Sequence, residues 1–210
     1  DGKLLLSKDG TEIILAATGA EYGYYKLDKK YTAIGESAFS GTDIVSLEIE
    51  NINTIIRPYA FANCAKLIEV YFPEAGILEV GAHAFDNAVK LGNVRNIEKV
   101  LSIGDYAFAR TDIRHVEIRP NAVVGEGAFF RSKLEYAVIG EGATFGMGAF
   151  QSCTYLKTVS MPVNGGVKFG EACFAYDTSL QSIDLSKMTE IAAQAFYGCT
   201  SLKTVNLAEV

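Results

Sequence analysis

The sequence contains no tryptophan, only two histidines, four prolines and four cysteines, and no long hydrophobic run. No stretch approaches the roughly 18 consecutive apolar residues that suggest a membrane-spanning helix. The net charge is −6, the pI is near 5.0, and charges of one sign do not form runs. The chain therefore lacks the basic surface that nucleic acid or an anionic membrane attracts. We expect neither nucleic-acid binding nor membrane insertion of this segment.

The start of the sequence shows no signal peptide, and its end shows no closing element. The chain begins at Asp1 without the basic and apolar regions of a signal peptide, so we expect any such peptide to have been removed already. It ends at Val210, directly after a strand-like segment and without a polar closing element. We expect the chain to be a piece of a longer protein.

The residues of known catalytic motifs are also missing. His83 and His115 have no nucleophile motif near them, and we expect both to face solvent. The glycine-rich segments GEGAF and GEGATFGMG lack the Gly-Lys-Ser/Thr of a phosphate loop and fall at different phases of the repeat described below, so we interpret them as turns. The sequence predicts no catalytic residue and no cofactor, and we expect a protein that is not an enzyme.

The four cysteines do not indicate a disulfide or a metal site. Cys64, Cys153 and Cys199 share one repeat position, and Cys173 occupies another. The nearest pair of the three, Cys153 and Cys199, stands two strand spacings apart, roughly 10 Å, beyond the reach of a disulfide. No CxxC pair or neighbouring histidine suggests zinc. We expect free, buried thiols and no metal.

What the sequence does contain is an internal repeat of 21 to 24 residues, aligned on a phenylalanine that usually follows alanine. Eight copies carry it, and we expect their rings to stack as an internal ladder: Phe39, Phe61, Phe85, Phe108, Phe129, Phe150, Phe174 and Phe196. An apolar residue stands five positions before each phenylalanine, and a Leu–x–x–Val–x–Leu pattern follows it. In the third copy this pattern slips by one residue, to Ile97 after Asn96, which predicts a local irregularity.

These columns predict an α+β repeat solenoid of about eight units. Segments such as KTVNL alternate apolar and polar residues, which is typical of a half-buried strand that pairs in parallel with its neighbours. A second, shorter strand precedes the phenylalanine, and about one helical turn surrounds it. Residues 34–210 form this stack. Residues 1–33 do not fit the frame; their two apolar runs around Lys8-Asp9-Gly10 predict a β-hairpin that caps the N-terminal end.

Units such as IGDYAFARTDIRHVEIRP and IAAQAFYGCTSLKTVNL resemble the BspA-like, or Treponema pallidum-type, class of leucine-rich repeats. The resemblance covers residues 34–210 and implies a right-handed stack. The family occurs mainly in secreted or surface proteins of bacteria, and some members adhere to host proteins or to other cells. Departures are modest: Ala88 and Asp177 replace a common cysteine, and the proline after the strand remains only at Pro73, Pro120 and Pro162.

The outward face of the strands is the remaining candidate site. Residues on either side of the central apolar residue of each strand point outward. In the C-terminal copies they are small and polar, whereas copies two to five carry tyrosines and charged groups, residue types that include those enriched at binding hot spots. The candidate ligand-binding residues are Glu69, Tyr71, Arg95, His115, Glu117, Arg119 and Tyr136.

Two functional hypotheses follow. In the first, a secreted or surface-exposed protein binds a protein or glycan, including extracellular proteins of a host, through this face. In the second, the same stack is a structural spacer within a larger surface protein, with an outward face that is solvated and binds nothing.

Overall fold

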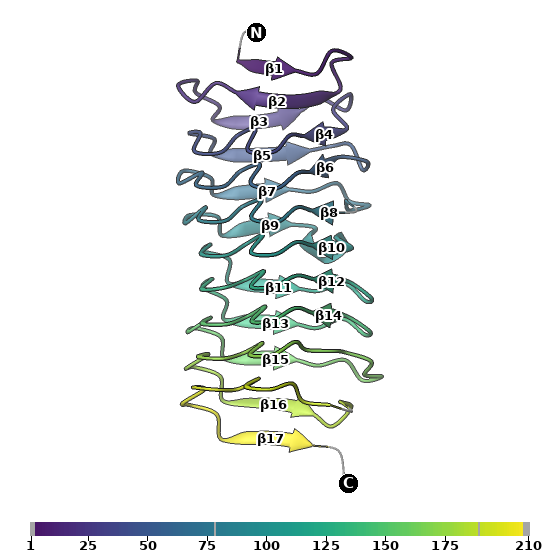
Figure 1. The fold of residues 1–210 in the computed structure, drawn as a ribbon, viewed down its shortest axis with the longest axis vertical. Coiled ribbons are helices and arrows are strands. Elements are labelled where there is room, and N and C mark those ends of the chain that lie inside the picture. The colour runs from purple at the N-terminus through teal and green to yellow at the C-terminus, as the bar shows by residue number, and fades with distance from the viewer. Residues whose placement is uncertain (1–2, 78, 189, 208–210) are drawn as a thin grey trace.

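A computed structural model describes residues 3–77, 79–188 and 190–207, and shows one column of stacked turns (Figure 1). Each turn contributes a longer strand to one side of the column, and all but the last two turns contribute a short strand to another (Figure 1). The described residues contain nine of the longer strands, so the stack has about nine turns. The predicted repeat solenoid with parallel strands is confirmed.

The short strands form one continuous sheet of eight strands. Its first two strands pair antiparallel as the predicted hairpin, and all later pairs are parallel. In spatial order the strands are β1 (Leu4–Leu6), β2 (Glu12–Ala16), β4 (Ala33–Ile34), β6 (Ile55–Ile56), β8 (Glu79–Val80), β10 (Ser102–Ile103), β12 (Val123–Val124) and β14 (Thr144–Phe145).

The longer strands lie in two separate parallel sheets on another side of the column. The first contains β3 (Tyr24–Leu27), β5 (Ser46–Ile49), β7 (Glu69–Tyr71) and β9 (Asn93–Arg95). The second contains β11 (His115–Glu117), β13 (Tyr136–Val138), β15 (Thr158–Ser160), β16 (Ser182–Leu185) and β17 (Thr204–Leu207). We call the outward surface of both sheets the long-strand face.

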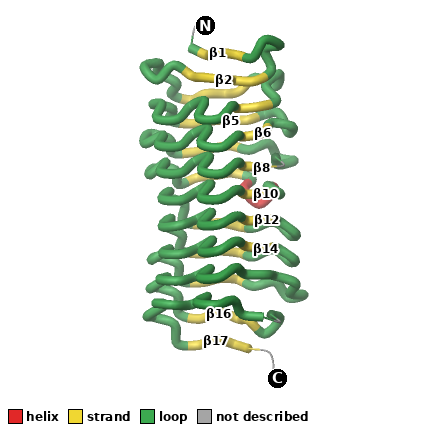
Figure 2. Tube along the Cα trace, in the orientation of Figure 1, coloured by secondary structure: helices red, strands yellow, loops and turns green. Residues whose placement is uncertain are grey.

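The helical component of the prediction is wrong. Among the described residues the only helix is the 3-10 turn η1 (Ile97–Lys99), the single red segment of Figure 2. Two backbone positions explain this, because the residues two before and two after every ladder phenylalanine have positive φ. Around Phe61 these are Tyr59 and Asn63, both at φ 59°. A left-handed residue on each side interrupts the helical hydrogen bonds.

The turns around the phenylalanines instead form a ladder of main-chain hydrogen bonds between repeats. In the turns from Phe39 to Phe174, the N–H groups of the phenylalanine and of the left-handed residues two positions before and after it donate to the next turn. The N–H of Phe39, for example, donates to the carbonyl of Ala60 across 2.8 Å. The third side of the column is therefore as continuously bonded as a parallel sheet.

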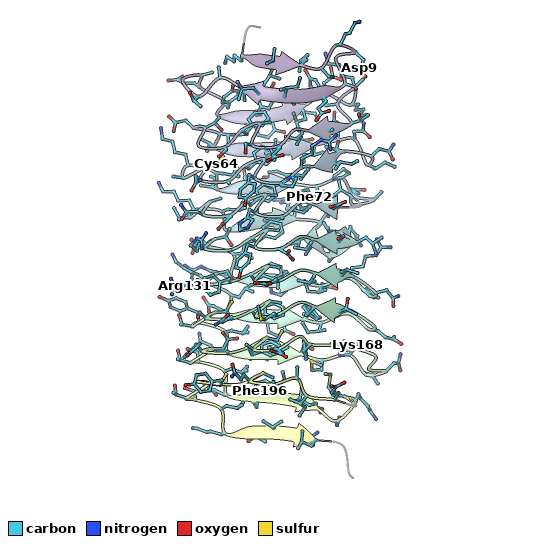
Figure 3. The ribbon with its side chains drawn as sticks, in the orientation of Figure 1. Asp9, Cys64, Phe72, Arg131, Lys168 and Phe196 are labelled. Atoms are coloured by element: carbon cyan, nitrogen blue, oxygen red, sulfur yellow. The ribbon has the colours of Figure 1, made fainter. Side chains whose placement is uncertain are left out.

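The eight ladder phenylalanines stack in the interior of the column (Figure 3). Their ring centroids are 5.1 Å apart between Phe39 and Phe61 and 5.7 Å between Phe108 and Phe129, and the rings are close to parallel. From Phe39 to Phe174 the rings are fully buried. Such buried aromatic side chains supply a large share of the apolar area that stabilises the stack.

Residues 12–27 form the first turn of the stack and do not lie outside the repeat pattern. β2 pairs in parallel with β4, and β3 pairs with β5. Tyr22 and Tyr25 replace the ladder phenylalanine there, and the Tyr22 ring meets Phe39 edge-on at 5.5 Å. The outer limits of the predicted units, residues 1–2 and 208–210, lie outside the described residues.

The irregularity predicted at the third copy is confirmed. Asn96 has a left-handed backbone, φ 63°, and leads directly into η1. At this point β9 and β11 belong to different sheets, although β8, β10 and β12 beside them stay paired. Figure 1 shows β9 and β11 farther apart than other successive long strands. We call this interruption of the long-strand face the sheet break.

Candidate ligand-binding face

Strand alternation determines which side chains the long-strand face presents. In most of these strands the central residue, such as Val70 or Val116, is buried, and its two neighbours point outward. Parallel pairing in register then aligns outward residues of successive turns, so that Glu69 lies beside Asn93 and Tyr71 beside Arg95. Residues more than 20 positions apart in sequence thereby become neighbours.

Three of the predicted residues form a connected group on β7 and β9. The hydroxyl of Tyr71 donates to Oε2 of Glu69 across 2.6 Å, and Ser46 donates to Oε1 across 2.9 Å. These hydrogen bonds, the one from Tyr71 above all, lower the pKa of the Glu69 carboxyl. The Arg95 guanidinium lies 4.9 Å from the centroid of the Tyr71 ring, a cation–π contact. Among the described residues, no carboxylate forms an ion pair with the exposed Arg95.

A second pair of predicted residues lies on the other side of the sheet break, in the second sheet. His115 on β11 and Tyr136 on β13 meet edge to face, with ring centroids 5.0 Å apart. Glu117 is exposed at the other end of β11. Arg119 lies beyond that strand, where its guanidinium donates to the carbonyl of Lys99 at the end of η1. In the part of the chain that the structure describes, no hydrogen bond, ion pair or ring contact joins this pair to the Tyr71 group.

Two open hollows meet at Arg95. The larger, about 760 Å³, extends toward the N-terminal turns and is lined by residues that include Glu48, Tyr71 and Glu74. The other, about 450 Å³, extends across the sheet break to His115 and Glu117. A smaller and more enclosed cavity, about 210 Å³, lies far along the stack between residues 161–167 and 184–188. Of the predicted residues, Tyr71, Arg95, His115 and Glu117 line these two adjoining hollows, whereas Glu69, Arg119 and Tyr136 line neither.

The face also includes residues that the sequence analysis missed. Tyr24 and Glu48 are hydrogen-bonded through the tyrosine hydroxyl, and Lys26 forms ion pairs of 2.9 and 3.0 Å with Glu48 and Glu50. Tyr24 and Lys26 belong to residues 1–33, which were expected to lie outside the repeat. Glu48 and Glu50 lie in or beside the strand of the first copy, ahead of copies two to five, which supplied the candidate residues. The alternating segment Tyr24–Leu27, aligned with Ser46–Ile49, was the available signal.

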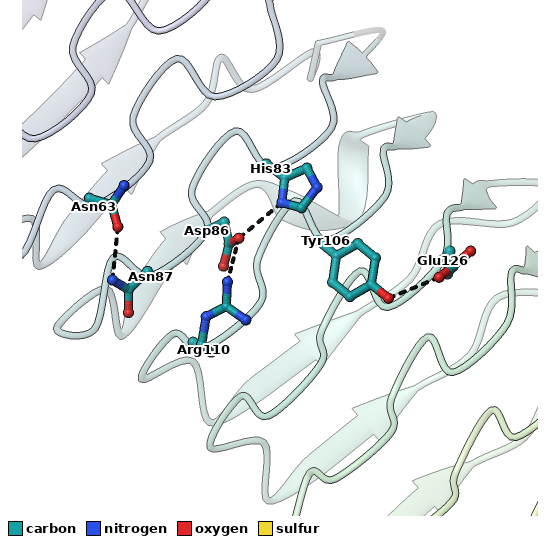
Figure 4. A network of polar contacts seen from close by, with 7 residues as sticks. All are labelled: Asn63, His83, Asp86, Asn87, Tyr106, Arg110 and Glu126. Atoms are coloured by element: carbon teal, nitrogen blue, oxygen red, sulfur yellow. Dashed lines mark hydrogen bonds and ion pairs between the residues drawn. The ribbon is translucent and has the colours of Figure 1, made fainter.

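His83 occupies a separate polar cluster on the turn side of the column (Figure 4). Its ring stacks between Tyr59 and Tyr106, at centroid distances of 4.6 and 5.2 Å. Its Nδ1 lies 2.9 Å from Asp86, which also accepts a bond of 2.6 Å from Arg110. His83 is therefore half-buried rather than solvent-facing as predicted. No serine or cysteine side chain is in hydrogen-bond contact with it among the described residues, so the cluster has no candidate nucleophile.

The cysteines are free thiols, as predicted. Burial raises the pKa values of Cys64, Cys153 and Cys173, and it raises the pKa of Cys199 to about 11. Within the described ranges no group of three potential ligands could hold a metal ion, and no helix is long and apolar enough to cross a membrane.

Comparison with known proteins identifies the repeat. A family model for the BspA type leucine-rich repeat region matches residues 32–157 and 123–210, in six copies. A leucine-rich repeat protein from Bacteroides ovatus has a similar structure, with a TM-score of 0.57 and 21% identity over 87% of this chain. The T. pallidum leucine-rich repeat protein has a TM-score of 0.50 and 23% identity over 97% of this chain and 78% of its own length. The chain spans 60% of the B. ovatus protein. No curated protein sequence matches it significantly.

Proposed function

Because the chain belongs to the BspA-type leucine-rich repeat family, we propose that it is a non-enzymatic binding module that takes a protein or glycan ligand on its long-strand face. The observation that carries this proposal is the exposed Arg95 guanidinium over the Tyr71 ring, at the meeting point of two hollows. Tyrosine and arginine are enriched among residues that dominate binding energy.

The arrangement of the Tyr71 group supports recognition of a polar ligand. The Tyr71 ring is fixed on one edge by Glu69 and covered on one face by Arg95, so little side-chain entropy is lost when a ligand docks. Arg95 is attracted by the nearby Glu69 carboxyl but forms no ion pair with any described carboxylate, so its fork of N–H donors is available to a carboxylate or hydroxyl of the ligand. His115 and Tyr136 offer a second aromatic contact across the sheet break.

We place this binding module at the cell surface or in the extracellular space, where it would contribute to adhesion. The family resemblance supports that location, since such repeats occur mainly in secreted and surface proteins. The negative net charge of −6 also fits a partner other than nucleic acid.

A structural spacer is the second candidate function. The C-terminal part of the long-strand face favours it, because β15 to β17 present small polar groups such as Thr158, Ser182 and Thr204. A face of this kind is typical of a solvated sheet. In this alternative the stack separates other domains and binds nothing itself.

A ligand array separates the two functions. The folded chain is applied to arrays of extracellular proteins and glycans beside a Tyr71→Ala, Arg95→Ala, Tyr136→Ala triple variant. A Thr158→Ala, Asp184→Ala, Asn206→Ala variant alters the polar end of the same face and serves as the control. We expect a ligand that the first variant loses and the control keeps. Binding that survives the first variant contradicts the assigned site, and no binding by the unaltered chain favours the spacer.

A further inference from the structure

The sheet break leaves two strand edges facing each other without main-chain bonds between them. β9 pairs with β7 on one side, and β11 pairs with β13 on the other. Among the described residues, no backbone hydrogen bond joins β9 to β11. Elsewhere on this face every strand is paired with the next one in the stack. The break is therefore a pair of internal sheet edges, which natural proteins usually cover.

The register identifies the peptide groups that face the break from β9. The Asn93 N–H donates to Ile68, and the Arg95 carbonyl accepts from Phe72, so both residues direct their peptide groups toward β7. Peptide groups alternate in direction along a strand. Val94 therefore directs its N–H and carbonyl toward β11.

The peptide groups of β11 alternate in the same way. The Arg114 carbonyl accepts from Tyr136, and the Ile118 N–H donates to Val138, so these residues face β13. His115 and Glu117 alternate with them and direct their peptide groups toward β9. Donors and acceptors thus line both walls of the break.

Side chains confirm that the break is open. Val94 is half-buried, although the residues at the same position in the adjacent turns, Val70 and Val116, are fully buried. The hollow of about 450 Å³ described above is lined by both β9 and β11, and Asn96 and η1 close it at one end. An apolar side chain and unpaired peptide groups are accordingly accessible in one depression.

We propose that the sheet break binds an extended peptide segment of a partner protein, which inserts as an additional strand between β9 and β11. This inference rests on the proposed binding function and names the ligand as a polypeptide. The alternation of donors and acceptors on Val94, His115 and Glu117 matches a peptide backbone, which presents the same alternation. A glycan has no regular series of amide groups to match them.

The charges at the rim of the sheet break indicate which type of side chain the peptide should carry. Arg95 stands at one wall and forms no ion pair with a carboxylate among the described residues, and its side chain lies on the outward face beside the break. Arg114 nearby is already paired with Glu135 at 3.0 Å. We therefore expect an outward acidic side chain on the inserted strand, opposite Arg95.

The break is held open by the rest of the turn. Ile97 of η1 is buried, and Asn96 donates from its amide group to the Phe72 carbonyl across 2.7 Å, which fixes the chain where it leaves β9. The short-strand sheet and the turn ladder remain bonded across the same two repeats. A peptide would thus enter a preorganised opening and would not have to separate paired strands.

The test begins with a displayed library of random linear 12-residue peptides, selected on the unaltered chain. The selected peptide is then synthesised in two forms, one unmodified and one N-methylated at alternate amides. We expect N-methylation to weaken binding at least about tenfold, because two main-chain hydrogen bonds are lost. We also expect the backbone amides of Val94, His115 and Glu117 to become protected from hydrogen exchange when the unmodified peptide binds.

Two protein variants complete the test. His115→Pro removes an N–H that faces the break and that no other strand uses, whereas His115→Ala removes only the imidazole. We expect the proline variant to lose most of the affinity and the alanine variant to keep more of it. If His115→Pro does not fold, the N-methylated peptide still tests the main-chain contacts on the unaltered protein.

The outcomes separate this inference from the proposed function. A peptide that binds the long-strand face without protecting the three amides overturns strand insertion and leaves the binding function intact. Strand insertion is likewise overturned if only glycans or folded proteins bind and no linear peptide is selected. If neither peptides, proteins nor glycans bind the unaltered chain, both the insertion and the binding function are wrong.

Discussion

The thiol of Cys153 donates a hydrogen bond to the main-chain carbonyl of Phe129 in the preceding turn, across 3.1 Å. The same bond recurs in two other turns, from Cys64 to Phe39 and from Cys199 to Phe174. This bond explains why a cysteine suits the position three residues after a ladder phenylalanine. A cysteine is small enough for the interior, and its thiol gives the carbonyl a further donor beside the N–H of its own turn.

Replacing Asp177 with cysteine should stabilise the fold. Asp177 occupies the cysteine position of its turn, and both its carboxyl oxygens are buried without a partner. Burial raises the pKa of this carboxyl well above the ordinary value of 3.8. We expect Asp177→Cys to increase the free energy of unfolding by about 3 kcal/mol at pH 7, measured by urea denaturation.

The gain should depend on pH. The folded-state pKa of Asp177 is raised, so the stabilisation that its proton provides is complete below the unfolded pKa and is lost as pH rises toward the folded pKa. The advantage of the Asp177→Cys variant should accordingly be small at pH 3.5 and large at pH 7. Asp177→Ala is the control that shares the pH dependence but lacks the thiol. An equal gain at both pH values would contradict a buried neutral carboxyl.

Loss of a ladder ring should cost most in the middle of the stack. Phe108 is fully buried between two parallel rings, whereas Phe196 is only half-buried and stacks on one ring. We expect Phe108→Ala to lower the free energy of unfolding by about 3–5 kcal/mol, and Phe196→Ala to lower it by less than half as much. Chemical denaturation of both variants measures this difference. Equal losses of unfolding free energy in the two variants would mean that stacking on a second ring adds no stability.

The left-handed position two residues before the phenylalanine offers a matched pair of substitutions. Ala172 adopts φ 53° there, and glycine fills the same position at Gly148, with φ 58°. Because a Cβ is strained in this region, Ala172→Gly should raise the free energy of unfolding by about 0.5–1 kcal/mol, and Gly148→Ala should lower it. Thermal unfolding of the two variants gives the signs. A destabilising Ala172→Gly substitution would show that chain entropy outweighs the strain.

Removing the hydroxyl of Tyr71 should raise the pKa of Glu69. That hydroxyl makes the largest contribution to the lowered pKa, and Ser46 contributes less. We expect the Glu69 titration, followed by carboxyl-carbon NMR, to move toward its ordinary value of 4.5 in Tyr71→Phe. Ser46→Ala should move it less. A larger shift in Ser46→Ala than in Tyr71→Phe would reverse the assignment of the main hydrogen bond.

The spacing of apolar residues was sufficient to predict the solenoid, because a buried position requires an apolar residue that can be recognised in the sequence. Phe85, for instance, must be large and apolar, as it is fully buried between two rings. A left-handed backbone conformation cannot be recognised in the sequence in this way when the residue is not glycine. Tyr59, His83 and Tyr106 all have positive φ, and none of them signals it, so a helical turn was predicted where none forms.

The candidate site was predictable only in part. Alternation and register were enough to expect Tyr71 beside Arg95 and His115 beside Tyr136. The slip at Asn96 predicted an irregularity but not its effect on pairing, which depends on how η1 displaces the strand that follows in the stack. The first turn was missed because tyrosines take the place of its phenylalanine.

The turn ladder has a mechanical consequence. Its hydrogen bonds run along the column, as do those between strands, whereas the strands themselves run across it (Figure 1). A pull along the column would load the bonds of one boundary at a time, so the turns would peel off in sequence rather than shear together. Each turn of about 22 residues would release a chain of roughly 75 Å when it unwinds. Such a column would lengthen in steps under tension. Each step would limit the force that reaches the segments it connects.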